Sequence, residues 1–218
     1  RDGKVRWQIE RLDNALDAQV LPGQRVLIAE YGSHRITERD FKGNVLWEKK
    51  FPDPPYAAQR LPNGRTFVAT QQRLLEIDRE GKEVLTIKAQ SRAAARFPDG
   101  RFALLGDDRL YRRYDTTGKE VSSVRIDFQR SNTLGGALFL PNGHVVLDDN
   151  NSVKEYDAAG KKVWEVKVQQ ADSIQRLPSG NTFIATMAEG RVVEFDRNGK
   201  VVWEKKYEGR RPWMARRR

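Results

Sequence analysis

Short extended runs bounded by turn residues follow one another along the chain. In the run from 65 to 70, Phe67 and Ala69 fall on one side of a predicted strand and Thr66 and Val68 on the other. Runs of this length, rich in β-branched and aromatic residues and ended by Pro, Asn, Asp or Gly, are typical of strands. No window keeps a 3.6-residue period for three turns, so helices are not indicated. The pattern predicts an all-β protein.

Two short phrases alternate along the sequence and divide it into repeats. The first is Gly-Lys-Val-x-Trp or a variant of it, and it begins at Gly3, Gly43, Gly81, Gly118, Gly160 and Gly199. The second has the form Leu-Pro-x-Gly, with its proline at Pro22, Pro62, Pro98, Pro141 and Pro178. Each phrase returns after about 40 residues, as in solenoids and propellers. Four antiparallel strands in such a repeat form the blade of a β-propeller.

The repeats predict a single β-propeller domain over residues 1–218. The full repeats run roughly over 11–50, 51–89, 90–127, 128–168 and 169–208. Val5 to Glu10 resembles a lone fourth strand, and Trp213 to Arg218 a lone first strand. We therefore expect a six-bladed propeller whose last blade, incomplete in this chain, is shared by the terminal segments 1–10 and 211–218. A five-bladed propeller with two extra strands is the alternative.

An Asp-x-x-Gly turn precedes the last strand of every full repeat. Its aspartates are Asp40, Asp78, Asp115, Asp157 and Asp196. An aspartate can accept hydrogen bonds from backbone N–H groups of the turn, and glycine supplies a positive φ. Metal binding is the other interpretation of these carboxylates, and we favour turn closure.

Tryptophan recurs at one fixed place in the repeat, four residues after the turn glycine. Trp7, Trp47, Trp164 and Trp203 hold this place, and Leu85 and Ser122 hold it in the other two copies. A large flat side chain at one site per repeat predicts packing between neighbouring repeats. Stacking on a cofactor is less favoured, because the place falls on the outermost strand.

The repeated phrases resemble those of bacterial PQQ-like and arylsulfotransferase-like propeller proteins. The likeness rests on Asp-x-x-Gly-Lys-Val-x-Trp-Glu followed by Leu-Pro-Asn-Gly-Asn-Thr and an apolar pair, and it covers the whole chain. It implies a β-propeller, but its motifs are structural and carry no activity. Enzymes of the arylsulfotransferase-like type depend on a catalytic histidine with basic helpers, and no local motif here matches one residue for residue.

Composition excludes several chemistries and weakens others. The chain has no cysteine, which excludes disulfides, thiolate nucleophiles and cysteine-bound metals, and it leaves a periplasmic and a cytoplasmic location equally open. No apolar run is long enough to span a membrane, and no secretory leader precedes Asp2, so any targeting segment is absent or already removed. The formal charge is +10, but much of the excess lies in Arg210, Arg211, Arg216, Arg217 and Arg218, so nucleic-acid binding is not favoured.

Propeller topology predicts that functional residues lie at one end of the blades. Turns joining strands one to two and three to four are nearly uniform, whereas loops joining strands two to three, and one blade to the next, all differ. Variation on a shared scaffold is typical of function. The predicted ligand-binding residues, around the mouth of a central channel, are Tyr31, His34, Tyr56, Arg92, Asp107, Asp108, Arg130, Asn132, Asp149, Asn150, Asp172 and Trp213.

The sequence therefore predicts a monomeric, non-catalytic scaffold that binds a protein partner or a polar ligand. His34 is the one candidate for acid–base work, because imidazole titrates near neutrality; His144 is interpreted as structural. The alternative is an enzyme of arylsulfotransferase-like, lyase-like or quinoprotein type centred on His34. No cofactor is expected; PQQ with calcium, held by Asp107 or Asp149, is the weaker alternative.

Overall fold

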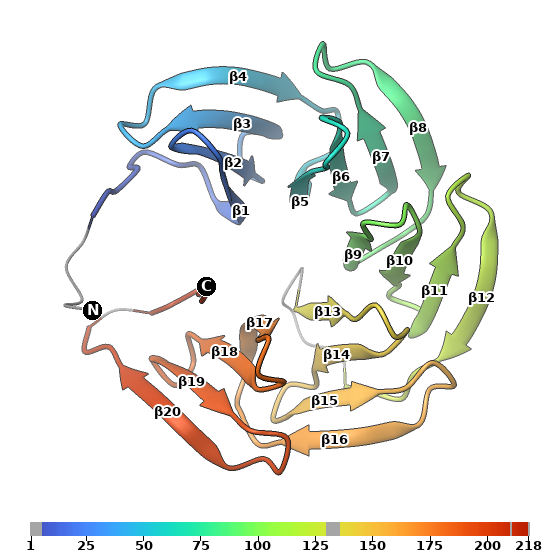
Figure 1. The fold of residues 1–218 in the computed structure, drawn as a ribbon, viewed down its shortest axis with the longest axis vertical. Helices are drawn as coiled ribbons and strands as arrows, with labels where there is room; N and C mark the ends of the chain where they lie inside the picture. The colour runs from blue at the N-terminus through green and yellow to red at the C-terminus, as the bar shows by residue number, and fades with distance from the viewer. Residues whose placement is uncertain (1–5, 130–135, 210, 218) are drawn as a thin grey trace. The chain divides into compact units, whose positions relative to one another are not determined.

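The computed structural model describes residues 6–129, 136–209 and 211–217, and all of their regular structure is β-strand. The strands form five separate four-stranded antiparallel sheets (Figure 1), and in each sheet the strands pair in the order of the chain. Each sheet is one propeller blade, so the predicted all-β propeller architecture with four-stranded blades is confirmed.

The chain divides into two compact units, Arg1–Ser91 and Arg92–Arg218. The first unit contains blade 1, with β1 (Ala15–Leu21), β2 (Arg25–Glu30), β3 (Arg35–Asp40) and β4 (Val45–Lys50), and blade 2, with β5 (Pro55–Arg60), β6 (Thr66–Thr70), β7 (Arg73–Ile77) and β8 (Glu83–Lys88). The sequence prediction of a single domain stays a prediction.

The second unit contains three blades. Blade 3 has β9 (Ala93–Arg96), β10 (Phe102–Leu105), β11 (Leu110–Tyr114) and β12 (Glu120–Arg125). Blade 4 has β13 (Ala137–Phe139), β14 (Val145–Asp148), β15 (Val153–Tyr156) and β16 (Lys162–Val166). Blade 5 has β17 (Ala171–Arg176), β18 (Thr182–Thr186), β19 (Arg191–Phe195) and β20 (Val201–Lys206).

The prediction of a sixth blade shared by the chain ends is wrong. The described residues form five blades, and neither 6–14 nor 211–217 contains a strand. The alternative of five blades has the right number, but its two extra strands are absent as well. A strand forms only where a neighbouring strand takes up its backbone hydrogen bonds, and none does so here. The segments use side chains instead: Trp7 stacks on Phe41, with ring centroids 4.4 Å apart.

Apolar layers hold the blades together within each unit. In the first unit, Leu27 and Ile36 of blade 1 and Val68 and Leu75 of blade 2 belong to one buried cluster. In the second unit, alternate residues of β14 face different clusters: Leu147 packs with blade 3 and Val146 with blade 5. This alternation is the two-residue period of a strand buried on both faces. It explains why the second strands read as continuous apolar runs.

The third and fourth strands of every blade share one irregularity. Their pairing register shifts at Glu38/Arg39, Glu76/Ile77, Arg113/Tyr114, Glu155/Tyr156 and Glu194/Phe195. Just before the shift, the residue of the tryptophan column lies directly opposite the third strand, as Trp47 opposite Glu38 and Trp164 opposite Glu155 do. A β-bulge of this kind re-aims side chains and increases strand twist.

The Asp-x-x-Gly turns close as the sequence predicted. In all five blades the aspartate carbonyl accepts from the glycine N–H, and Oδ1 accepts from the next N–H, as from Lys200 to Asp196 at 2.9 Å. The glycines take positive φ, for example 80° at Gly199. Turn closure uses the carboxylates that a metal would need.

Candidate functional site

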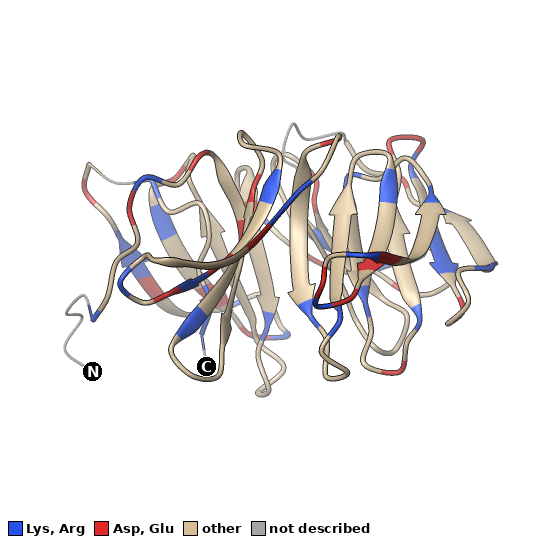
Figure 2. Ribbon diagram, turned by 90° about the horizontal axis from the view of Figure 1, so that it is seen from above, with Lys and Arg blue, Asp and Glu red and all other residues tan. Residues whose placement is uncertain are grey.

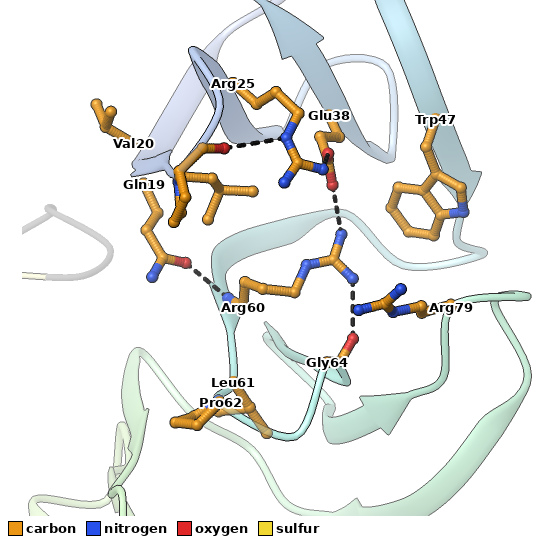
Figure 3. Close-up of a pocket in the computed structure, with 12 residues that line it drawn as sticks. Gln19, Val20, Arg25, Glu38, Trp47, Arg60, Leu61, Pro62, Gly64 and Arg79 are labelled. Atoms are coloured by element: carbon orange, nitrogen blue, oxygen red, sulfur yellow. Dashed lines mark hydrogen bonds and ion pairs between the residues drawn. The ribbon is translucent and has the colours of Figure 1, made fainter.

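A salt bridge, a tryptophan and a pocket mark the boundary between blades 1 and 2 (Figure 3). Arg60, on the first strand of blade 2, donates from Nη2 to Glu38 Oε2 of blade 1 at 2.7 Å. Its guanidinium carbon lies 5.7 Å from the ring centroid of Trp47. We call this arrangement of a third-strand Glu, a fourth-strand Trp and an Arg from the following segment the interblade clamp. It combines an ion pair with a cation–π contact.

The clamp of blades 1 and 2 borders a pocket of about 550 Å³. Arg25 bonds the other oxygen of Glu38 at 2.5 Å, and Arg60 also donates to the Gly64 carbonyl at 3.1 Å (Figure 3). Arg79 lies near Gly64 as well, at the edge of the same pocket. The pocket lining therefore holds three guanidinium groups and one carboxylate, which is an excess of positive charge.

A second clamp joins blades 4 and 5. Glu155 accepts from Arg176 and Arg197, both at 2.6 Å, and from His144 Nδ1 at 2.9 Å. Arg176 lies 5.7 Å from the Trp164 ring centroid. Burial by itself would raise the pKa of Glu155, but the hydrogen bonds from Arg197 and His144 and the charge of Arg176 outweigh it and lower that pKa. His144 therefore has the structural role that the sequence indicated.

The segment after blade 5 forms a third clamp. Arg217 pairs with Glu194 and lies 5.6 Å from the Trp203 ring centroid. Gln175 of β17 bonds the backbone of Arg217 on both sides, donating at 2.9 Å and accepting at 2.8 Å. Trp47 and Trp164 thus pack between neighbouring blades as predicted, whereas Trp203 lies against the segment that follows blade 5. Arg217, one of the arginines that raise the net charge, therefore forms an ion pair within the chain.

The boundary between blades 3 and 4 departs from the clamp. Arg113 stands in the place of the glutamate and Ser122 in that of the tryptophan, and the two lie opposite each other. Phe139 replaces the arginine of the following blade. Arg113 donates from Nε and Nη2 to Ser122 Oγ at 3.1 and 2.9 Å. A pocket of about 310 Å³ lies beside them.

Three of the predicted site residues lie in the first unit. Tyr31 and His34 occupy the turn between β2 and β3, where His34 is exposed and takes a positive φ of 51°. The His34 imidazole makes no hydrogen bond or ion pair with the residues that the structure describes. Tyr56 is the extra residue of a bulge in β5, buried, with its hydroxyl 2.8 Å from Ser91 Oγ.

Three others lie at the loops of blade 3. Arg92 is buried just before β9, and its Nη1 lies 3.7 Å from Asp107 Oδ1. Asp108, in the turn between β10 and β11, pairs with Arg112. The hydrogen bond from Arg112 lowers the pKa of Asp108, so this carboxylate is ionised at neutral pH. Asp107 and Asp108 are both exposed, and the first joins this loop to the start of the blade.

Asp149, Asn150 and Asp172 lie around the boundary of blades 4 and 5. Asp149 is buried and pairs with Lys154, and the Asn150 carbonyl accepts from the Gln170 N–H at 2.8 Å. Asp172 is the extra residue of a bulge in β17, and its Oδ2 accepts from the Met187 N–H at 2.7 Å. Burial, aided by the negative charge of Asp148, raises the pKa of Asp172.

The remaining predicted positions are Arg130, Asn132 and Trp213. Arg130 and Asn132 lie outside the described residues, and Trp213 is partly buried in the segment after blade 5. No group of three or more His, Asp or Glu side chains suited to a metal ion occurs in the described part of the chain. The expectation of no cofactor, and its alternative of PQQ with calcium held by Asp107 or Asp149, stay predictions.

No helix in the described residues could cross a membrane. Lysine and arginine alternate with aspartate and glutamate along the strands and turns of both units (Figure 2). This mixture is unlike the single-sign stripe of a nucleic-acid-binding face.

The ionic part of the clamps was missed from the sequence, although a signal was present. Arginine precedes the Leu-Pro or Phe-Pro phrase at Arg60, Arg96 and Arg176. Glutamate stands two residues before the turn aspartate at Glu38, Glu76, Glu155 and Glu194. Two charges at fixed places in a repeat predict a repeated pair. The third repeat has Arg113 in place of this glutamate, and the pocket between blades 3 and 4 lies at that residue.

These blades, clamps and turns define a β-propeller of the tryptophan-docked type. A protein-family model described as outer membrane protein assembly factor BamB, of the PQQ-like repeat type, matches residues 87–213. The chain belongs to this PQQ-like repeat family. A comparison with curated proteins finds no match.

Solved structures share the fold at low sequence identity. A protein of unknown function from Bacteroides caccae is 20% identical with a TM-score of 0.66, covering 87% of this chain and 80% of its own. A streptogramin B lyase is 10% identical with a TM-score of 0.68, covering 90% and 70%. BamB from Moraxella catarrhalis is 16% identical with a TM-score of 0.58, covering 93% and 67%. At these identities the likeness concerns the fold alone.

Proposed function

We propose that this protein is a non-catalytic scaffold that binds a protein partner through the loop ends of its blades. The loop ends are the connections between second and third strands and between successive blades. One observation carries the proposal. The Asp-x-x-Gly turns have the same hydrogen bonds in all five blades, whereas the side chains of the connections between second and third strands differ from blade to blade. A partner that recognises one particular surface needs such differences.

The chemistry of the loop ends suits a protein surface. Within the first unit, His34 is exposed beside the partly buried Tyr31. Within the second unit, Asp107, Asp108 and Asn151 are exposed on loops held by buried residues. Mixed charged, amide and aromatic groups on rigid supports are typical of protein interfaces. The family to which the chain belongs is described by an outer membrane protein assembly factor, which agrees with a role in protein interaction.

Catalysis has less support. A general base is normally oriented by a second group, as a carboxylate orients a histidine. His34 has no such contact with the described residues, and His144 is engaged with Glu155. The likeness to a streptogramin B lyase carries only the fold.

Site-specific photo-crosslinking tests the proposal. A photoreactive phenylalanine analogue would replace Tyr31 in the first unit or Asn151 in the second, and it would replace Lys42 or Asn198 as matched turn-end controls, both exposed. We expect one protein, identified by mass spectrometry, to be crosslinked from loop-end positions and not from the controls. The same product should form with the His34→Ala protein.

Two results would contradict the proposal. Crosslinks from Lys42 and Asn198 alone would place the partner at the other end of the blades. Loop-end positions that label no protein, but are protected by a bound polar metabolite detected in native mass spectra, would favour the small-ligand alternative.

A further inference from the structure

The boundary between blades 3 and 4 lacks two groups that the other clamps contain. Between blades 4 and 5, the boundary holds an indole from Trp164 and a carboxylate from Glu155, and an arginine binds both. Between blades 3 and 4 the equivalent positions are Ser122 and Arg113. An arginine remains, supplied from the third strand, but the aromatic ring and the negative charge are missing.

The place left by the missing indole is open. The pocket of about 310 Å³ at this boundary has a largely apolar wall made by Phe97, Phe102, Leu140 and Pro141. Its volume reaches the lower end of the range for small-molecule sites, which begins at about 300 Å³. A flat ring can therefore enter where a shorter side chain has replaced tryptophan.

The polar groups of this pocket call for an anion. Arg113 uses Nε and Nη2 on the neutral hydroxyl of Ser122, and it pairs with no carboxylate of the described residues. Its Nη1 lies at the Gly143 turn, only 2.8 Å from where a Cβ on that glycine would be. The Tyr111 side chain lines the pocket, is 0% exposed, and its hydroxyl has no partner within the described chain.

Burial raises the pKa of Tyr111, so its hydroxyl stays protonated and can donate. A buried donor without an acceptor is destabilising, and a guanidinium beside an apolar wall favours a carboxylate. Two donors and a vacant ring position thus occur in one pocket.

We propose that the pocket between blades 3 and 4 binds an aromatic carboxylate, with its carboxylate on Arg113 and Tyr111 and its ring against Phe97 and Leu140. Such a ligand supplies both groups that this boundary lacks. The carboxylate can belong to a free aryl acid or to the last residue of a chain that ends in an aromatic side chain. The pocket is walled by the Pro-x-Gly turn of blade 4, so it is separate from the loop ends and does not depend on the partner proposed there.

Isothermal titration calorimetry of the whole chain tests this proposal with indole-3-acetate as the free acid. A short peptide ending in tryptophan with a free carboxylate tests the second source. We expect saturable one-to-one binding of at least one of them. Indole-3-acetamide and the C-terminally amidated peptide should bind at least tenfold more weakly, because they lack the charge that Arg113 recognises.

Two variants locate the binding. Arg113→Gln should weaken it at least tenfold, and Ser122→Trp should abolish it by placing an indole in the pocket, as in the other clamps. Ser123→Trp is the matched control, because it adds the same ring at the exposed neighbour of Ser122 and should leave affinity unchanged. The proposal fails if neither acid nor peptide binds at millimolar concentration, if the amides bind equally well, or if Ser122→Trp retains binding.

Discussion

The two boundaries inside the second unit have the same strand geometry and opposite chemistry. Between blades 4 and 5, Glu155 gathers Arg176, Arg197 and His144 around one carboxylate. Between blades 3 and 4, Arg113 occupies the place of that carboxylate and, among the described residues, bonds the hydroxyl of Ser122. The strand pairing and the bulge are the same in both. The framework of a blade is therefore set by its apolar layers and turns, while the boundary can be closed by charge or left as a pocket.

The largest effect should come from removing the carboxylate at the closed boundary. Glu155→Ala leaves Arg176 and His144 facing each other without an anion, and loss of one partner of a buried ion pair costs about 3–5 kcal/mol. Urea denaturation should show this loss. Glu165→Ala, which removes a more exposed carboxylate of the same blade, should cost less than about 1 kcal/mol. Equal losses in the two proteins would show that the clamp adds nothing beyond a surface pair.

Replacing Trp164 with serine, the residue found at the equivalent place between blades 3 and 4, should cause the next largest loss of stability. Trp164→Ser removes a ring that is 9% exposed, and a buried tryptophan is worth about 3 kcal/mol or more. Trp203→Ser should cost about half as much, because Trp203 is 38% exposed. Thermal unfolding of the two variants measures the difference. A Trp203→Ser protein that loses as much as Trp164→Ser would refute the argument from burial.

Lowering the pH should destabilise the boundary between blades 4 and 5 before the boundary between blades 3 and 4, and this is the smallest of the three expected effects. The pKa of Glu155 is lowered from its ordinary value of 4.5 in the folded protein, so its contribution is complete above that pH. The contribution is lost as the pH falls below 4.5 through the lower, folded pKa. At the other boundary Arg113 lies opposite Ser122, so the place of Glu155 holds no carboxylate. Hydrogen exchange, corrected for its intrinsic pH dependence, should quicken in β16 and β17 before β12 and β13.

A Glu155→Gln protein is the control for this acid effect, since it should lack that separate step. Parallel loss of protection at both boundaries, with the variant behaving like the parent, would contradict the assignment to Glu155.

Much of the fold followed from the sequence, because it is encoded locally. Each Asp-x-x-Gly turn and each strand depends on residues close together in the chain. Five copies of the full repeat therefore predict five complete blades. The terminal segments could not be judged in this way. Met214 to Arg217 resembles Ala57 to Arg60 in sequence and even bonds Gln175 as Arg60 bonds Gln19, yet it forms no strand. Pairing depends on a neighbour, and a sequence pattern does not report whether one is in place.

The candidate sites were predicted less well, because they depend on residues far apart in the chain. Glu38 and Arg60 belong to different blades and meet only after both have folded. Residues at the loop ends could be named from their variability, but burial could not: Tyr56 and Arg92 lie inside, whereas His34 lies outside. The pocket at Arg113 is visible only when the five repeats are compared position by position.

The repeated bulge between third and fourth strands limits where insertions and deletions can occur. A strand alternates its faces residue by residue, so losing Val163, the additional residue of β16 in this bulge, would turn the residues on one side of it to the opposite face. Length changes at that end of a blade therefore undo its contact with the next one. The connections between second and third strands lie outside the strand pairing. Insertions and deletions there can change the loop length without changing which face of a strand packs on the next blade.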